Sequence, residues 1–414
     1  MDEVTRPLSG VKVVEMAAFV AMPAVGRFLA DMGAEVVKIE SAKGDNLRYT
    51  APNEGRPSDV HEDMTFDLEN ANKKAIVLDV RTDKGKEVLF KLLDDADIFL
   101  TNWRPGALSR AHLTYEELKD RYPKLVYTSL TGYGEKGPDK DLPGFDYTAF
   151  FARTGWSGSL YQKGTVPPNL TPALGDHQTA LALIGGTLAA LHRATLTGKG
   201  DKVCVSLMHV GIWVQSYPIQ AAQYGDEFGG LTYPYDRRDN PLPYMPSVET
   251  KDGRFLQVMG PNFGIYWPLI MKAIGREDVL ADDELNDQRR MQAAGRVGEG
   301  YDIVQEGFRQ KTYEEWVPIL TELDIPFALC STYEEITKDK QAWANDVFYE
   351  MDYPRGKKAL VRTPVQFVDT PLPPYEKAPL LGEDTEEVLR GLGYSDEEIK
   401  QMEADKTAVQ GDRK

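Results

Sequence analysis

The sequence predicts an α/β protein, with one large domain built on a mostly parallel sheet and one smaller α+β domain. β-rich runs alternate with helical stretches through the first half of the chain. Strands that alternate with helices in this way form a parallel sheet that helices cover on both faces. The 414 residues are enough for two or three domains, and 42% hydrophobic and 27% charged residues are ordinary for a globular protein.

The large domain opens with a β-α-β unit. The run GVKVVEM at 10–16 is β-rich, and helical spacing follows at 23–34, where Pro23 suits the first helical turn and Gly33 suits the end. The order of elements looks like a Rossmann-like, dinucleotide-binding fold, but the fingerprint G-x-G-x-x-G is missing after the first strand. Further strands are expected at 34–40, 74–80, 97–103, 124–134 and 202–208, and helices at 82–96, at 114–123 and from Asp176 onward.

A turn-rich segment divides the second half of the chain. We expect the large domain to begin with residues 1–224 and to be completed by the returning segment 326–414. Between them we expect a linker at 225–248 and the small domain at 249–325. The long segment 133–172 is rich in Gly, Pro, Tyr and Phe, and long loops of this kind are usually functional. Beyond the linker we expect a strand pair at 247–260, helices near 265–275, 296–311 and 313–323, a paired ribbon at 347–368 and a surface helix at 395–406.

Composition argues against several classes of function. The formal net charge of −17 disfavours a nucleic-acid partner, because phosphate binding needs a basic face. No apolar run reaches about 18 residues, so no membrane span or membrane partner is expected. The two cysteines, Cys204 and Cys330, stand far apart and fit a reducing cytoplasm, and no His, Cys and carboxylate cluster has metal-ligand spacing. A P-loop is also missing.

One carboxylate stands at the start of a long apolar helix pattern, in the stretch ALGDHQTALALIGG. Asp176 could cap that helix, since Asp is a preferred N-cap residue. Asp176 could equally be a covalent nucleophile, because a helix start keeps a carboxylate ionised and Gly175 lets a ligand approach the backbone. His177 is expected to point in another direction and to have no catalytic role.

A second signal, TNWRPGALSR, ends another expected strand. Asn102 closes this strand, Trp103 and Arg104 follow it, and Arg110 lies beyond a Pro-Gly turn. Ligands of open α/β sheets bind at the carboxyl ends of strands, so these side chains could hold phosphates and stack on a base. The same residues could equally be a Pro-Gly turn with solvated arginines and no ligand. Arg81 follows the strand at 74–80 and has the same two interpretations.

Together these stretches resemble the class III (family III) CoA-transferases, which include formyl-CoA transferase. The resemblance rests on LSGVKVVEMAAFVAMPAVGRFLADMGAEVVKIE, DVRTDKGKEVLFKLLDDADIFLTNWRPGAL, YPKLVYTSLTGYGEKGP and ALGDHQTALALIGGTLAAL, and it covers nearly the whole chain. It implies an interlocked-ring homodimer with Asp176 as the nucleophile. It also implies a CoA site, formed by Leu78, Asp79, Val80, Arg81, Asn102, Trp103, Arg104 and Arg110. The substrate pocket that it implies is formed by Val20, Ala21, Phe145, Asp146 and Tyr147.

Two features of formyl-CoA transferase are missing. Its Gln after the first strand is replaced here by Val20 and Ala21, and its glycine run by MGPNFGIYW. A bulkier substrate pocket is the expected consequence.

Within the family, DLENANKKAIVLD and QAWANDVFYEMDYP look most like the enzymes of amino-acid-fermenting anaerobes that act on 2-hydroxyacids such as phenyllactate or 2-hydroxyisocaproate. The resemblance therefore implies a CoA-transferase. It would move CoA from an acyl-CoA or enoyl-CoA to an aromatic or branched 2-hydroxycarboxylic acid, through an aspartyl anhydride and an aspartyl-CoA thioester. The CoA thioester would be a co-substrate, and no permanently bound cofactor or metal is expected.

Two other functions stay open at this point. The related 2-methylacyl-CoA racemases have a histidine where this chain has Phe145, which argues against two-base proton transfer. A non-catalytic CoA-binding scaffold would use Asp176 only as a helix cap. The sequence does not choose among the possible acids.

Overall fold

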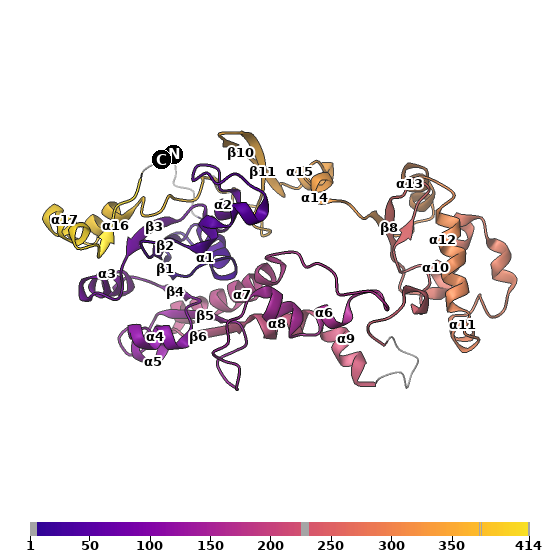
Figure 1. Ribbon diagram of the computed structural model, residues 1–414, viewed down its shortest axis with the longest axis horizontal. Coiled ribbons are helices and arrows are strands. Elements are labelled where there is room, and N and C mark those ends of the chain that lie inside the picture. Colours follow the sequence, from indigo (N-terminus) through magenta and orange to yellow (C-terminus); the bar gives the residue numbers. More distant parts are fainter. Residues whose placement is uncertain (1–5, 225–231, 372, 374, 413–414) are drawn as a thin grey trace. The chain divides into compact units, whose positions relative to one another are not determined.

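The computed structural model describes residues 6–224, 232–371, 373 and 375–412 (Figure 1). The chain divides into two compact units. Unit 1 contains Met1–Thr154, Leu170–Val214 and Lys340–Lys414, and unit 2 contains Gly155–Asn169 and Gln215–Asp339. Residues 225–231 of the expected linker lie outside the described residues.

A seven-stranded sheet forms the centre of unit 1, in the order β12-β3-β2-β1-β4-β5-β6. Every neighbouring pair is parallel except β12 and β3, which are antiparallel. The predicted, mostly parallel sheet is therefore confirmed. Its strands are β1 (Lys12–Met16), β2 (Glu35–Glu40), β3 (Lys74–Leu78), β4 (Ile98–Thr101), β5 (Val126–Thr131), β6 (Lys202–Ser206) and β12 (Ala408–Val409).

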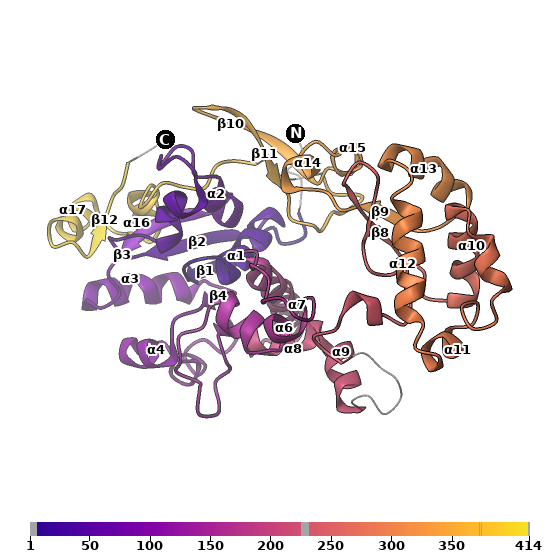
Figure 2. The same cartoon turned by 45° about the vertical axis from the view of Figure 1, so that its right-hand side comes forward.

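The two faces of this sheet differ in chemistry because side chains alternate along each strand. Val14 and Val37 belong to an apolar cluster shared with α3 (Asp83–Asp94), α16 (Thr385–Gly391) and α17 (Asp396–Ala404). Figure 2 shows α16, α17 and β12 beside β3. Glu15 and Lys38, which alternate with these apolar residues, are fully buried on the other side, under α1 (Ala21–Asp31).

The long helix α7 (Leu174–Thr197) packs on the same side as α1. The Thr187 hydroxyl lies 2.9 Å from the Thr128 hydroxyl of β5, which joins α7 to the sheet. By length and composition alone α7 could cross a membrane, although the sequence showed no sufficient apolar run. Contact with the sheet explains its composition equally well, since core helices are also apolar.

Shorter elements complete unit 1. The segment 133–172, expected to be a functional loop, contains the π-helix η3 (Asp146–Ala152), and the expected ribbon is confirmed as the antiparallel pair β10 (Phe348–Tyr353) and β11 (Gly356–Val361). The other elements are η1 (Asn46–Tyr49), η2 (Ala51–Glu54), α2 (Met64–Asn70), α4 (Pro105–Ala111), α5 (Tyr115–Leu118), α8 (Leu207–Val214) and α15 (Lys340–Ala344).

Unit 2 has its own apolar core, which includes the buried rings of Trp267, Phe308 and Trp316. Its antiparallel sheet has the order β7-β8-β9. Because β9 pairs with β8, unit 2 extends past the bounds 249–325 that the sequence suggested. Its strands are β7 (Val248–Glu249), β8 (Phe255–Val258) and β9 (Phe327–Leu329); its helices are α6 (Trp156–Ser159), α9 (Ser216–Ala221), η4 (Ala222–Tyr224), η5 (Arg237–Asp239), α10 (Phe263–Ile274), η6 (Glu277–Ala281), α11 (Gln288–Ala293), α12 (Val297–Phe308), α13 (Tyr313–Glu322) and α14 (Tyr333–Ile336).

Candidate active site

A cavity of about 320 Å³ lies in unit 1, where the carboxyl ends of β1, β4 and β5 meet the start of α7. This is the edge at which open α/β sheets bind ligands. The lining residues are Ala18, Phe19, Val20, Ala21, Asn102, Trp103, Arg104, Pro105, Leu130, Thr131, Gly132, Lys140, Leu142, Gly144, Phe145, Asp176 and Leu207. Seven residues expected in the site therefore share one cavity: Asp176, Asn102, Trp103, Arg104, Val20, Ala21 and Phe145.

Asp176 is the third residue of α7 and does not cap it. The N-cap is Ala173, with a left-handed φ of 66° and no side-chain hydrogen bond, so the expected start at Asp176 was wrong. Burial, followed by the like charge of Asp146, raises the pKa of Asp176 to about 7. The helix start therefore does not lower the pKa of this carboxylate, because burial and Asp146 outweigh the helix dipole here.

Gly175 allows close packing of α7. A Cβ atom at this position would lie 2.6 Å from Cγ of Phe150 and 2.9 Å from Cβ of Asp146. The backbone of α7 thus lies directly against η3, and a side chain at Gly175 has no room. The expected approach of a ligand to the Gly175 backbone stays a prediction.

Asp146 begins η3 and is buried beneath the start of α7. Its Oδ1 accepts a hydrogen bond of 2.7 Å from the backbone N–H of Tyr147. Burial raises the pKa of Asp146, and backbone hydrogen bonds, including one from Gly175, act in the opposite direction. Tyr147 donates its hydroxyl to the Leu170 carbonyl at 3.0 Å. Neither Asp146 nor Tyr147 is among the residues that line the cavity, so their predicted contact with substrate stays a prediction.

His177 belongs to a different groove, of about 790 Å³, between α1, α2, α7 and β11. Its Nε2 lies 2.8 Å from Oε1 of the buried Glu69. Burial alone would lower the pKa of His177, but Glu69 and Asp176 outweigh it, so the pKa is raised. Asp176 therefore lines the cavity and His177 the groove, in agreement with the expectation that these neighbouring side chains point in different directions.

The turn after β1 forms one wall of the cavity, and side chains from distant segments hold its backbone. Lys38 Nζ donates to the Ala17 carbonyl at 2.8 Å, and Asp45 Oδ1 accepts from the Phe19 N–H at 2.9 Å. Asn102 Nδ2 donates to the Ala18 carbonyl at 2.7 Å, and the Ala18 N–H donates to Asn102 Oδ1 at 3.2 Å. Phe19 itself has a left-handed φ of 66°, which is uncommon for a residue other than glycine.

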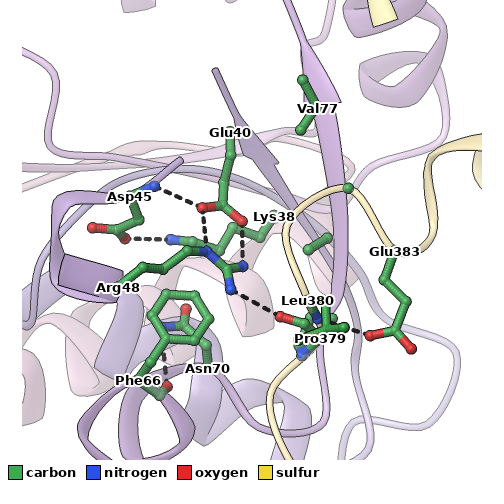
Figure 3. A network of polar contacts seen from close by, with 12 residues as sticks. Lys38, Glu40, Asp45, Arg48, Phe66, Asn70, Val77, Pro379, Leu380 and Glu383 are labelled. Atoms are coloured by element: carbon green, nitrogen blue, oxygen red, sulfur yellow. Dashed lines mark hydrogen bonds and ion pairs between the residues drawn. The ribbon is translucent and has the colours of Figure 1, made fainter. Parts of the chain in front are cut away.

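Lys38 and Asp45, which hold the turn, belong to a buried charge network, part of which is drawn in Figure 3. Lys38 Nζ lies 2.9 Å from Oδ2 of Asp45 and 3.0 Å from Oε1 of Glu15, and Lys73 Nζ lies 2.8 Å from Oε2 of Glu15. Burial opposes the charge on Lys38, but its acidic neighbours outweigh burial and raise its pKa. Removal of one partner would leave a buried charge uncompensated, which is strongly destabilising.

The residues expected to bind the CoA nucleotide are not all in one place. Leu78 and Val80 are buried in the core of the sheet, and their side chains do not reach the cavity. Arg81 pairs with Asp79 at 2.7 Å. Those four residues and Arg110 of α4 lie outside the cavity lining, so their contact with CoA stays a prediction.

Sequence reasoning missed Phe19 and Lys140, which also line the cavity. The position of Phe19, directly after the first strand, was the available signal. For Lys140 only its place in the long segment 133–172 pointed to the site.

A carboxylate at the strand ends of a parallel α/β sheet is an arrangement suited to a group-transfer enzyme. A sequence model for CoA-transferase family III matches residues 8–385, so the chain belongs to this family and is an enzyme that transfers CoA. The resemblance seen in the sequence is thereby confirmed.

Individual relatives cover almost the whole chain. Cinnamoyl-CoA:phenyllactate CoA-transferase of Clostridium sporogenes is 53% identical over 407 residues, which are 98% of each protein. (R)-2-hydroxy-4-methylpentanoate CoA-transferase of Clostridioides difficile is 42% identical over 96% of this chain and 98% of its own. Formyl-CoA:oxalate CoA-transferase of Escherichia coli O157:H7 is 31% identical over the same two shares, 96% and 98%.

Solved structures share the fold. A CaiB/BaiF family protein from Brucella suis superimposes with a TM-score of 0.76 at 27% identity, over 94% of this chain and all of that one. A protein from Mycobacterium tuberculosis gives a TM-score of 0.79 at 25% identity, over 92% and 99%.

Proposed function

We propose that the enzyme moves CoA from an acyl-CoA or enoyl-CoA to a 2-hydroxycarboxylic acid with an aromatic or branched side chain. The observation that carries this proposal is the 53% identity, over 98% of both chains, with a cinnamoyl-CoA:phenyllactate CoA-transferase. The second relative, named for 2-hydroxy-4-methylpentanoate, supports the same chemical class.

In the proposed reaction Asp176 carries the acyl group and then the CoA. Its carboxylate attacks the donor thioester carbon, the C–S bond breaks, and CoA thiolate leaves behind a mixed anhydride. The thiolate attacks the Asp176 carbonyl carbon, which releases the donor acid and forms an aspartyl-CoA thioester. The acceptor carboxylate displaces the thiolate, and the thiolate then attacks the acceptor carbonyl, which frees Asp176. No net proton, oxidant or ATP is required.

The cavity lining supports these roles. Asp176 lines the cavity of about 320 Å³ that would hold the thioester end of the substrate, and Arg104 lines the same cavity and would bind a phosphate group of CoA. Asn102, in contrast, has both polar atoms of its amide bound to the backbone of Ala18. We therefore assign to Asn102 the positioning of the turn.

The family resemblance also leads us to propose a homodimer with interlocked chains, and the two unpaired cysteines lead us to propose a cytoplasmic location. Large apolar side chains remain exposed on α7 and α8, among them Leu196, Ile212 and Trp213, and a second copy would cover such a surface. Light scattering of the purified protein should give twice the mass of one chain. A monomer at micromolar concentration would contradict this part of the proposal.

A screen of the purified enzyme tests the function itself. Donor thioesters, cinnamoyl-CoA among them, are paired with phenyllactate, 2-hydroxy-4-methylpentanoate and oxalate, and new thioesters are identified by mass. We expect transfer to the 2-hydroxyacids and little to oxalate. Transfer to oxalate alone would overturn the proposed substrate class.

A further inference from the structure

Two aromatic rings face each other on the wall of the cavity that holds Asp176. Phe19 comes from the turn after β1 and Phe145 from the residue before η3, and both line the cavity. Their ring centroids lie 5.4 Å apart at an interplanar angle of 88°, which is an edge-to-face contact. Such pairs are favourable beyond the area they bury, and a further ring can join them in the same geometry.

The backbone that carries the Phe19 ring is held by residues from other segments. Phe19 has a φ of 66°, and its N–H is bound to Asp45, whose carboxylate is buried and paired with Lys38 (Figure 3). On the preceding residue, Ala18, the amide of Asn102 holds both the N–H and the carbonyl. A wall that is already ordered loses little conformational freedom on binding, so its contacts contribute more fully to affinity.

Phe145 has exposed surface that a ligand could contact. The residue is 53% exposed and borders the cavity, and its backbone N–H is bound to the Thr148 hydroxyl at 3.1 Å. Phe19 and Phe145 line the same cavity as Asp176, so a group bound there would contact their rings.

We infer that Phe19 and Phe145 form the wall that selects the acyl side chain, and that they favour a phenyl group over a branched aliphatic group. This inference rests on the proposed function, since it concerns the side chain of the transferred acid. Loss of one edge-to-face contact should change the preference about two- to tenfold.

The test compares two acceptors with one donor. Phenyllactate and 2-hydroxy-4-methylpentanoate are each assayed with cinnamoyl-CoA, and the ratio of their kcat/KM values is measured for the unaltered enzyme and for Phe19→Leu and Phe145→Leu. Leucine keeps apolar bulk and removes the ring. We expect the ratio to fall about two- to tenfold in each variant, mainly through the KM of phenyllactate.

Two matched variants serve as controls. Phe145→Tyr keeps the ring, so the ratio should fall less than in Phe145→Leu. Phe255→Leu makes the same exchange at an exposed phenylalanine of β8, outside the cavity, and should leave the ratio unchanged.

The outcomes separate this inference from the proposed function. Unchanged ratios in both leucine variants, or equal losses for both acceptors, would overturn the inference while transfer itself continues. Failure of the unaltered enzyme to transfer CoA to either acid would overturn the proposed function, and the inference with it.

Discussion

Asn102 uses both polar atoms of its side-chain amide on the backbone of Ala18, at 2.7 Å to the carbonyl and 3.2 Å from the N–H. Asn102 lies at the end of β4 and Ala18 at the end of β1, so this pair joins two strand ends under the cavity. The two hydrogen bonds give Asn102 a positioning role at the turn that carries Phe19, separate from any contact with CoA.

We predict that Asn102→Ala lowers kcat about tenfold and changes the KM for acyl-CoA less than threefold. Two hydrogen bonds of about 0.5–1.5 kcal/mol each are lost, and the turn that bears Phe19 loosens. Steady-state kinetics with varied acyl-CoA separate the two constants. A large rise in KM with kcat unchanged would instead make Asn102 a direct CoA contact, as the family resemblance implies.

The rate should depend on the ionisation of Asp176. Burial and Asp146 raise its pKa to about 7, and only the carboxylate can attack a thioester. We therefore expect kcat/KM to rise about tenfold per pH unit below 7 and to level off above it. A rate that is constant between pH 5.5 and 8 would contradict this assignment.

The same shift has a consequence for stability. A carboxyl group whose pKa is raised on folding stabilises the fold at low pH, and this contribution is lost as pH rises through the folded pKa, here about 7. Asp176→Asn should therefore melt at a higher temperature than the unaltered protein at pH 8, and the difference should shrink at pH 5.

Arg104 and Arg110 provide a matched pair of charge removals. Arg104 lines the cavity with Asp176, whereas Arg110 lies outside its lining. We expect Arg104→Gln to raise the KM for acyl-CoA tenfold or more, because a charge-assisted contact is worth about 1.5–3 kcal/mol. Arg110→Gln tests the predicted contact of Arg110 with CoA. An equal increase would extend the nucleotide site to Arg110, and a change in KM of less than threefold would remove Arg110 from it.

Two glycines of α7 should respond in opposite ways to alanine. At Gly175 the new Cβ would meet Phe150 and Asp146, so Gly175→Ala should lower stability by about 1–3 kcal/mol. At Gly185 nothing lies within 4 Å, and alanine should raise helix stability by up to about 1 kcal/mol. Thermal melting of both variants checks this. Equal melting temperatures would show that η3 can move away from α7.

Much of the large fold could be predicted from the sequence because the strand and helix patterns are local. The place of Asn102 followed from topology, since parallel strands end at one edge of the sheet, whereas Asp176 was joined to this site only by the family resemblance. The close packing of Gly175 depends on η3, which no local sequence pattern predicted. Glu15 and Lys38 stand in β-rich runs, but their burial depends on pairing across the fold.

The place of Phe19 on the cavity wall was not predicted, although its position shortly after the first strand was a signal. Its backbone is left-handed, and Asp45 and Asn102 hold the turn from other segments. The raised pKa of Asp176 also depends on a residue that is distant in the sequence, since Asp146 of η3 lies near it. Such effects are set by contacts between distant residues, which a single sequence does not specify.

The central claim is that Asp176 becomes acylated, and peptide mapping after trapping tests it most directly. The enzyme is incubated with cinnamoyl-CoA and hydroxylamine, without an acceptor acid, and digested. We predict a hydroxamate mass shift on Asp176, no change on the neighbouring His177, and a parallel loss of activity; Asp176→Asn should show neither adduct nor transfer. The claim would be contradicted if Asp176 stayed unmodified and the treated enzyme still transferred CoA when an acceptor acid was added.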